Sequence, residues 1–224
     1  SVTYSGSVDM TDPANLTGFV QWAQSTYPSE RSILVPWNHG GGWTGLIEDQ
    51  TNSGSENMTL EEFKRALLPL PMIDIIDFDM CNMAGYSTLY QLQGQAEYAV
   101  FSQETVPGTG LPYMEILDAI QGSPTSSSEE VAVYLAAQYM VTTAAENPEA
   151  SITKSAYSLS GFSALDTAIG ALGTLLQARL PSWGPGLQIV GENSQHYHTE
   201  PLKDLVSFTT VLKANTTDAA VIAA

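Results

Sequence analysis

Basic residues are scarce in this chain of 224 residues: lysine and arginine together number 7, against 24 aspartates and glutamates. The formal net charge of −17 argues against nucleic acid as a partner, because phosphate backbones are bound by basic patches. Charged residues make up 14% of the chain, below the roughly 25% of an average domain. Two interpretations stay open: adaptation to a secreted or acid-exposed habitat, or a negative field that attracts cationic peptides.

Cysteine occurs once, as Cys81. A single cysteine excludes an internal disulfide and a metal site built from several thiolates. Two interpretations of the thiol stay open, because an unpaired cysteine is either buried and inert or placed where it can react.

Long apolar runs are missing as well. No uninterrupted run approaches the roughly 18 residues that a membrane span requires, so we expect no span. No basic-then-apolar signal segment opens the chain, and Ser1 is not an initiator methionine, which suggests a processed or excised piece of a longer protein. The apolar fraction of 43% supplies a sizeable core, and this length fits one domain.

Helical and strand patterns alternate along the chain. Asp12-Pro13 is a typical helix start, and Thr59 with Glu62 forms a capping box before a second helix. Strands are expected at 33–38, 73–80, 98–102 and 156–160, and helices from residue 13, over 59–68, 84–93, 129–145 and 165–179, and over 204–212. The alternation predicts a parallel α/β sheet covered by helices on both faces.

Two reactive side chains stand where predicted strands end. His39 follows the strand at 33–38 and precedes three glycines, and Cys81 follows the strand at 73–80. Because the carboxyl ends of neighbouring parallel strands share one edge of a sheet, we expect both side chains in one cleft. A thiol and an imidazole are the minimum requirement for cysteine nucleophilic catalysis. Asp74 and Asp77, inside the second strand, are better explained as edge or strand-end residues than as catalytic ones.

The surroundings of this pair suggest how it would work. Cys81 precedes a predicted helix, whose N-terminal amides would favour the thiolate. His39 would protonate the leaving amine, and the N–H of Gly40 would contribute to an oxyanion hole. A lone histidine or cysteine is usually structural, but their joint position at two strand ends favours a cysteine peptidase.

Two segments resemble the histidine and cysteine motifs of clostripain-like cysteine peptidases, namely Trp37-Asn38-His39-Gly40 and Asp-Phe-Asp-Met-Cys-Asn-Met-Ala at 77–84. That family belongs to the caspase-like clan, with gingipains, legumains and separase. The similarity extends over residues 9–13 and 102–108 and, more weakly, 163–166. It implies a caspase-like three-layer sandwich with a mostly parallel central sheet flanked by helices on both faces, in a single peptidase domain over residues 1–224.

The resemblance also implies an activity: a His39–Cys81 dyad that hydrolyses peptide or protein substrates, in the best-known members after arginine or lysine. Asp79 matches a family position in the acidic specificity pocket. An alternative for Asp79 stays open, because a carboxylate there could cap the helix expected after Cys81. We expect a secreted or cell-envelope microbial protein without a cofactor, although some relatives are activated by calcium.

The sequence departs from the family pattern at three places. Thr109 replaces the second pocket carboxylate, which leaves less negative charge for a guanidinium unless Glu104 swings into the vacancy. The loop from 43 to 62 has no basic residue for self-cleavage. The family's first strands and its C-terminal part have no counterpart, so we expect a fragment or a minimal version, with other fragments of the same precursor as partners.

Two functions of different classes therefore compete. The first is a cysteine endopeptidase with a weakened acidic pocket. The alternative is a catalytically inactive caspase-like binding or scaffolding module, which an incomplete sheet with an exposed edge would favour. The presence of both His39 and Cys81 favours the peptidase.

A metal site is a weaker hypothesis. His196 and His198 have a spacing that can ligate a metal, but no carboxylate or thiol cluster joins them apart from Glu192 and Glu200. We therefore expect no metal site.

Overall fold

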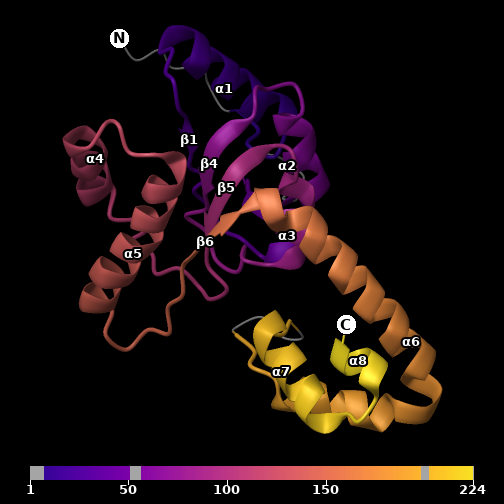
Figure 1. Ribbon diagram of the computed structural model, residues 1–224. Helices are drawn as coiled ribbons and strands as arrows, with labels where there is room; N and C mark the ends of the chain where they lie inside the picture. The colour runs from indigo at the N-terminus through magenta and orange to yellow at the C-terminus, as the bar shows by residue number, and fades with distance from the viewer. Residues whose placement is uncertain (1–7, 51–56, 198–201, 224) are drawn as a thin grey trace. The chain divides into compact units, whose positions relative to one another are not determined.

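The computed structural model describes residues 8–50, 57–197 and 202–223. The chain divides into two compact units, Ser1–Ser160 and Gly161–Ala224, and each is described by itself. The first unit holds the central sheet, and the second is helical (Figure 1). Because such a division does not decide whether the units fold independently, a single domain over residues 1–224 stays a prediction.

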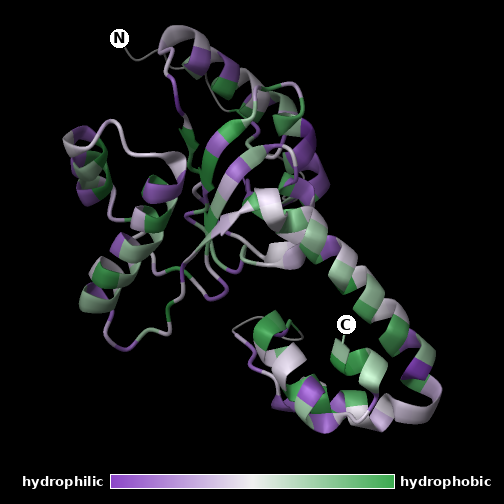
Figure 2. Cartoon of the chain, in the orientation of Figure 1, coloured by the Kyte–Doolittle hydropathy of each residue, from purple (hydrophilic) through white to green (hydrophobic). Residues whose placement is uncertain are grey.

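A four-stranded sheet forms the centre of the first unit. Its order is β1-β4-β5-β6, and the bounds are Ile33–Leu34, Ile73–Asp77, Ala96–Phe101 and Ser155–Ser158. β1, β4 and β5 are parallel, whereas β6 runs antiparallel to β5. The sheet is therefore mostly parallel, as predicted, and β1 and β4 are largely hydrophobic (Figure 2).

Proline shortens the first strand relative to the prediction. β1 pairs regularly with β4 only at Ile33 and Leu34, because Pro36 has no N–H to contribute to a ladder. The carbonyl of Pro36 still accepts the N–H of Asp79 at 3.0 Å, and an isolated bridge joins Trp37 to Asp79. The two chain segments thus stay side by side beyond the regular strands.

Helices cover both faces of the sheet (Figure 1). One face carries α1 (Pro13–Thr26), α2 (Leu60–Leu67) and α3 (Tyr86–Leu92), and the other carries α4 (Tyr113–Gly122) and α5 (Ser128–Glu146). The predicted capping box is present: Thr59 Oγ1 accepts the N–H of Glu62 at 3.1 Å, and the Glu62 carboxylate accepts the N–H of Thr59 at 3.0 Å. The three layers match the predicted fold class.

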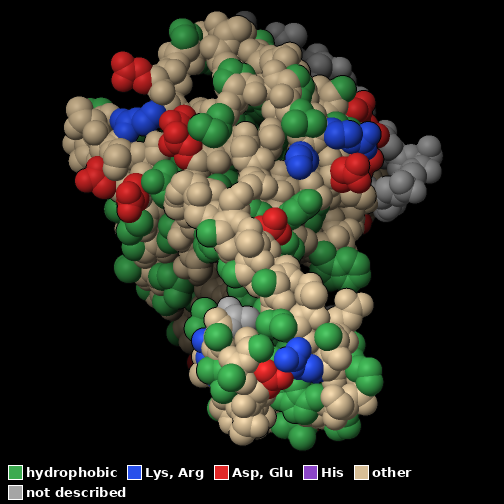
Figure 3. Space-filling view, turned by 45° about the vertical axis from the view of Figure 1, so that its right-hand side comes forward, with side chains coloured by type: hydrophobic (Ala, Val, Ile, Leu, Met, Phe, Trp, Pro, Cys, Tyr) green, Lys and Arg blue, Asp and Glu red, His purple; other side chains and the backbone are tan. Residues whose placement is uncertain are grey.

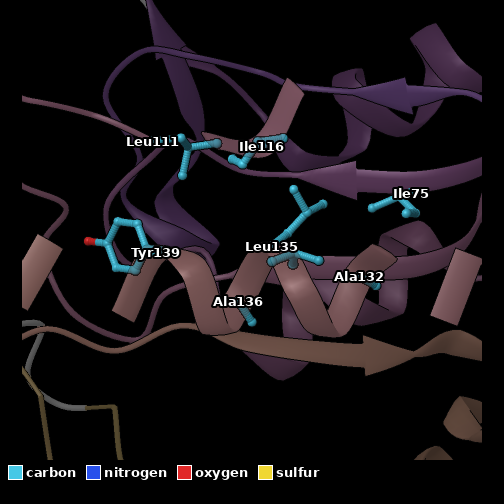
Figure 4. Close-up of a cluster of buried hydrophobic side chains, with 8 residues drawn as sticks. Ile75, Leu111, Ile116, Ala132, Leu135, Ala136 and Tyr139 are labelled. Carbon is cyan, nitrogen blue, oxygen red and sulfur yellow. The ribbon is translucent and has the colours of Figure 1, made fainter. Parts of the chain in front are cut away.

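The alternation of side chains along β4 decides which residues meet which helix layer. Ile75 belongs to a buried cluster with Ala132, Leu135, Ala136 and Tyr139 of α5 and with Val100, Leu111 and Ile116 (Figure 4). On the opposite face, the ring of Phe78 lies 5.8 Å from that of Phe63 in α2, between centroids. Asp77 and Asp79 therefore follow Ile75 on the α5 side.

Several features were not predicted from the sequence. They include the antiparallel direction of β6 and a short helix at Ala219–Ala223. Another is α4, whose N-cap residue Pro112 makes no side-chain capping bond. A further one is a two-stranded antiparallel sheet of β2 (Leu46–Glu48) and β3 (Asn57–Met58), whose strands are too short to give an alternating pattern.

The second unit consists of α6 (Phe162–Asn193), α7 (Leu205–Asn215) and α8 (Ala219–Ala223). Its small core is formed by Val190, Leu212 and Val221, and an ion pair joins Arg179 of α6 to Asp218. The helix predicted to end at Arg179 continues through Pro181 and Pro185 to Asn193.

By length and composition, the segment Leu159–Asn193 is long and apolar enough to cross a membrane. Its most apolar stretch of 18 residues has a mean hydropathy of 1.3, and 11% of that stretch is buried. We expected no span because no uninterrupted apolar run is long enough. The mean hydropathy over 18 residues can still be high when single polar residues interrupt the apolar ones. Length and composition alone do not distinguish a span from a surface helix, so the absence of a span stays a prediction.

Charged side chains are sparse on the surface shown in Figure 3, where acidic and basic groups are scattered rather than gathered in one patch. This matches the low charged fraction of the composition.

Candidate active site

A cavity of about 330 Å³ lies at the carboxyl ends of the parallel strands. Its lining residues are Trp37, Asn38, His39, Asp79, Met80, Cys81, Val106, Pro107, Gly108 and Gly110. These residues follow β1, β4 and β5, and β1 and β4 are neighbouring parallel strands. The sequence predicted this convergence for His39 and Cys81.

The segment after β1 is fixed by backbone contacts and leaves the His39 side chain exposed. The carbonyl of His39 accepts the N–H of Ile47 at 3.0 Å, and Asn38 Oδ1 accepts the N–H groups of His39 and Glu48 at 2.6 and 3.0 Å. Ile47 has a φ of 56°, which is a strained conformation for a β-branched residue. The hydrogen bonds around His39 therefore hold Ile47 in a backbone conformation that an isoleucine disfavours.

Gly40 is required by the close approach of two backbones. A Cβ at this position would collide with the carbonyl oxygen of Cys81 and lie 2.9 Å from Met80 Cβ. The backbone that follows His39 therefore rests directly on the turn that carries the cysteine. The oxyanion role expected for the N–H of Gly40 stays a prediction.

Cys81 is half-buried, and its sulfur contacts the loop after β5. The N–H of Val106 donates to Sγ at 3.2 Å, and the Val106 carbonyl lies 3.8 Å from the same sulfur. The prediction that helix amides point at this sulfur is wrong, because α3 begins at Tyr86 with Gly85 as its N-cap.

A non-helical turn separates Cys81 from α3. Asn82 has a φ of 58°, a left-handed conformation that asparagine tolerates better than most residues. Its N–H donates to the carbonyl of Glu104 at 3.0 Å, and the N–H of Ala84 donates to the carbonyl of Ser102 at 2.8 Å. The cysteine turn is thus bonded to the loop that follows β5.

Asp79 is only 3% exposed, and it is one of the residues that line the cavity. Oδ2 accepts the hydroxyl of Tyr113 at 2.7 Å and the N–H of Leu111 at 3.2 Å. Gly110, with a φ of 70°, leaves room for this carboxylate, since a Cβ there would lie 2.7 Å from Oδ2. The capping alternative is wrong, because the carboxylate is bonded to the 110–113 segment and α3 starts seven residues later.

Tyr113 responds electrostatically to this arrangement. Burial raises the pKa of the Tyr113 hydroxyl above its ordinary value, and the hydrogen bond to Asp79 and the negative charges of Asp79 and Asp77 raise it further. The phenol therefore stays a hydrogen-bond donor to Asp79 at neutral pH.

A buried ion pair lies behind Asp79. Lys154 Nζ is 2.7 Å from Asp77 Oδ1, with side chains that are 0% and 1% exposed. The ammonium also donates to the carbonyl of Phe78 at 2.8 Å and lies 5.2 Å from the ring centroid of Tyr139. Burial raises the pKa of Asp77, and the Lys154 ammonium opposes this. Asp77 is a strand-end residue, as expected, but in the buried centre of the sheet.

Thr109 and Glu104 lie outside the group of residues that lines this cavity. Thr109 is exposed, between Gly108 and Gly110, and lines a separate cavity with Leu111–Glu115 and the end of α5. The backbone of Glu104 is bound to Ser102 Oγ at 3.0 Å. The structure therefore brings His39, Gly40, Cys81 and Asp79 together but leaves these two residues at the periphery.

The described residues contain no group of three or more histidine, cysteine, aspartate and glutamate side chains that could hold a metal ion. His198 lies outside the described residues, so the pair His196 and His198 cannot be judged together. The absence of a metal site stays a prediction.

The family model of the clostripain peptidases, Peptidase_C11, matches residues 1–215. The chain belongs to the clostripain family. A curated relative, clostripain from Hathewaya histolytica, is 26% identical over 149 residues, which are 58% of this chain and 28% of the relative. The resemblance of the two sequence motifs is thereby confirmed at the level of the family.

Solved structures agree with the fold. A secreted C11 cysteine protease from Bacteroides thetaiotaomicron, in complex with an irreversible peptide inhibitor, is 27% identical, with a TM-score of 0.61 over 73% of this chain and 49% of that chain. An inactive zymogen C11 protease from Parabacteroides distasonis is 21% identical. Its TM-score is 0.69, and the match covers 100% of this chain and 60% of that chain. The caspase-like fold class is confirmed, and the chain spans less than two thirds of the length of these relatives.

Sequence reasoning missed Val106, Tyr113 and Lys154. Val106 and Tyr113 flank the Pro-Gly-Thr-Gly turn at 107–110, and that turn was the available signal. Lys154 is one of seven basic residues and directly precedes β6. None of the three contacts could be derived from spacing, because each depends on how β5, β6 and α5 pack.

Proposed function

We propose that this chain carries the catalytic site of a cysteine endopeptidase that cleaves peptide or protein substrates after a basic residue. The single observation that carries the proposal is the shared cavity, which His39, Cys81 and Asp79 line together at the carboxyl edge of the sheet. Membership of the clostripain family supports it, as does a relative that was solved with an irreversible peptide inhibitor.

In acylation, the Cys81 thiolate attacks the scissile carbonyl carbon, and a sulfur–carbon bond forms while an electron pair moves to the oxygen. The N–H groups of Gly40 and Cys81 hold this oxyanion. The carbon–nitrogen bond then breaks, and His39 gives its proton to the leaving amine. Water attacks the resulting thioester, His39 takes up the proton, and the acid product and free Cys81 are released.

The specificity of the proposed reaction rests on Asp79. Its Oδ2 is occupied by Leu111 and Tyr113, which orients the carboxylate for a cationic side chain in the cavity. Asp79 is the one carboxylate among the residues that line this cavity, so doubly charged capture of arginine is lost. We therefore propose a preference for basic residues that is weaker than a pocket with two carboxylates would give.

The proposed reaction requires no cofactor. The described residues contain no group of three or more histidine, cysteine, aspartate and glutamate side chains that could hold a metal ion, and no step is routed through calcium. A secreted or cell-envelope microbial protein is part of the proposal, since one similar protein from Bacteroides thetaiotaomicron is described as secreted. Other fragments of the same precursor are proposed as partners.

The test compares Cys81→Ala and His39→Ala with the wild-type chain on peptides that carry a reporter after arginine or lysine. We expect each substitution to lower kcat by about 10³-fold or more, and the double variant to be hardly worse, because the two residues act as a unit. His196→Ala is the matched control, since this exposed histidine lies outside the cavity. Circular dichroism verifies that all variants remain folded.

The outcomes separate the two functions. Activity that survives in Cys81→Ala contradicts the proposed mechanism. A folded wild-type chain that hydrolyses none of the peptides and whose thiol resists alkylation at neutral pH would favour the inactive binding or scaffolding module instead. Rapid alkylation of wild-type Cys81, lost when the protein is unfolded by urea, supports the peptidase.

A further inference from the structure

The start of β6 lies at the same edge of the sheet as the cavity. β6 is antiparallel to β5, and its first residue, Ser155, pairs with Phe101, the last residue of β5. The carboxyl end of β5 therefore meets the amino end of β6. Two polar residues, Thr153 and Lys154, come directly before Ser155, and neither lines the cavity.

Thr153 organises the loop that follows β5. Its hydroxyl Oγ1 accepts the N–H groups of Gln103 and Glu104 at 2.9 and 3.2 Å and shares a hydrogen bond with Ser102 Oγ at 3.0 Å. One side chain thus satisfies backbone donors from two consecutive residues of a loop, and it does so from the segment that leads into β6.

The same loop holds the cysteine. The carbonyls of Ser102 and Glu104 accept the N–H groups of Ala84 and Asn82, which flank the turn after Cys81. Val106, two residues after Glu104, donates its N–H to Cys81 Sγ at 3.2 Å. The Thr153 hydroxyl is therefore linked to the sulfur through its bonds to Gln103 and Glu104, the backbone from 104 to 106, and the bond from Val106.

Lys154 holds the segment on the other side of the cysteine. Its side chain, which is fully buried, reaches from the start of β6 across β5 to β4 and bonds Asp77 and the carbonyl of Phe78. Phe78 immediately precedes Asp79, so this bond fixes the peptide unit that leads into the cavity carboxylate.

The charge of Lys154 has a second consequence. Asp77 and Asp79 lie two residues apart on the same side of the chain, which places their side chains roughly 7 Å apart. Lys154 compensates Asp77 directly, so the cavity retains the negative charge of Asp79 without a second unpaired carboxylate behind it.

We propose that Thr153 and Lys154 are positioning residues of the active site: Thr153 fixes the loop that contacts the Cys81 sulfur, and Lys154 fixes the chain between Asp77 and Asp79. The proposal deepens the proposed peptidase function and rests on it. Neither residue touches the reacting atoms, so their effect should appear in the geometry of the thiol and the carboxylate.

The first experiment replaces Thr153 with valine, which keeps the volume and removes the hydroxyl. We expect kcat to fall about 10-fold or more with KM changed less than about twofold, because small misplacements of reacting groups are costly. Alkylation of Cys81 should become slower. The pH at which the alkylation rate reaches half of its maximum should rise, because the thiolate loses the hydrogen bond from the Val106 N–H. Thr153→Ser, which keeps the hydroxyl, should restore most of these values.

The matched control is Thr17→Val. Thr17 is also half-buried, and its hydroxyl donates to the carbonyl of Ala66 at 2.7 Å between α1 and α2, away from the cavity. If Thr153→Val and Thr17→Val lower the Tm similarly and both leave alkylation and kcat at wild-type values, Thr153 is merely structural and the inference is overturned. If Thr153→Val does not fold, Ser102→Ala takes its place in the comparison, because Ser102 carries the hydroxyl that is hydrogen-bonded to Thr153.

The second experiment separates stability from positioning at Lys154. Lys154→Met alone leaves Asp77 buried without its partner, so a large loss of Tm is expected. The double variant Asp77→Leu with Lys154→Met removes both charges and should recover most of the Tm. Because Phe78 still lacks its donor, we expect kcat/KM on basic substrates to remain about 10-fold below wild type.

The outcomes keep this inference apart from the proposed function. A double variant with wild-type Tm and wild-type kcat/KM overturns the role of Lys154. If the wild-type chain hydrolyses no peptide, the proposed function fails, but the alkylation rates of Thr153→Val and Thr153→Ser still decide whether Thr153 positions the thiol.

Discussion

The backbone N–H of Val106 donates to the sulfur of Cys81 at 3.2 Å. This contact comes from the loop after β5, whereas the sequence suggested that the helix after the cysteine would supply it. A neutral or anionic sulfur accepts such a bond, and the anion gains more from it because charge-assisted hydrogen bonds are the stronger ones. The stability of the thiolate therefore depends on where the 102–106 loop lies.

The cavity carboxylate should control the choice of substrate. We expect Asp79→Asn to lower kcat/KM about 10²-fold on arginine and lysine substrates and much less on neutral ones, because a buried charge-assisted contact is lost. The measurement is kcat/KM on peptides that differ only in the residue before the scissile bond. Asp74→Asn is the control, since Asp74 lies on β4 outside the cavity and is bonded to Ser32. Equal losses on basic and neutral substrates would contradict this role of Asp79.

Gly110 should tolerate no side chain. Gly110→Ala places a Cβ 2.7 Å from Asp79 Oδ2 and adds strain at a φ of 70°, so we expect at least a 10-fold loss of kcat/KM on basic substrates. Gly94→Ala is matched for strain, because Gly94 has a φ of 76° but no atom within 4 Å of the added Cβ. Both variants should lose about 1 kcal/mol of stability from the positive φ, measured by urea unfolding. Normal specificity in Gly110→Ala would show that the carboxylate can move away.

A carboxylate introduced at position 109 should have a small effect. Thr109 is exposed, and Gly108 and Gly110 line the cavity on either side of it. Because exposed ion pairs contribute little, we expect Thr109→Asp to raise the preference for arginine over a neutral residue by no more than about threefold. Kinetics on matched arginine, lysine and neutral peptides check this. A gain of about 10² or more would mean that residue 109 turns into the pocket when substrate binds.

Tyr139 should make the fold sensitive to alkali. Burial, followed by the negative charges of Asp79 and Cys81, raises the pKa of Tyr139 from its ordinary value of 10.0 to about 12. Since the folded state holds this proton more tightly, the corresponding stability is complete below pH 10 and is lost as the pH rises from about 10 to about 12. Unfolding by urea at pH 8 to 12 should show this loss, and Tyr139→Phe should reduce it.

The control for the alkaline experiment is Tyr27→Phe, because Tyr27 is 69% exposed. This variant should follow the wild-type dependence on pH. If Tyr139→Phe and the wild-type chain lose stability in parallel above pH 10, the buried phenol is not responsible.

Local signals predicted most of the fold. The alternation of strands and helices predicted a mostly parallel sheet with helices on both faces, and Thr59 with Glu62 marked the start of α2 correctly. His39 and Cys81 could be placed together because strand ends in a parallel sheet share an edge. These features depend on residues close in sequence or on a general rule of topology.

What could not be predicted depends on contacts between distant segments. The left-handed turn at Asn82 delays α3 to Tyr86, and it is held by carbonyls after β5 rather than by its own sequence. Lys154 reaches the site only because β6 is antiparallel to β5. The sequence of a four-residue strand does not indicate whether the strand is parallel or antiparallel to its neighbour. The 110–113 segment binds Asp79 through the N–H of Leu111 and the hydroxyl of Tyr113. Neither a leucine nor a tyrosine in the sequence indicates a functional site by its residue type.

The strained backbone at Ile47 bears on how this protein could be altered. A β-branched residue at a φ of 56° costs roughly 1–3 kcal/mol, and Ile47 directly holds the carbonyl of His39. Glycine or asparagine at position 47 would release that strain, but each would also remove a buried side chain, because Ile47 is only 8% exposed and burial of an isoleucine contributes about 1.5–3 kcal/mol. Burial of this one side chain therefore offsets the strain of the loop that presents the imidazole, and removing it would loosen that loop without making the protein more resistant to heat.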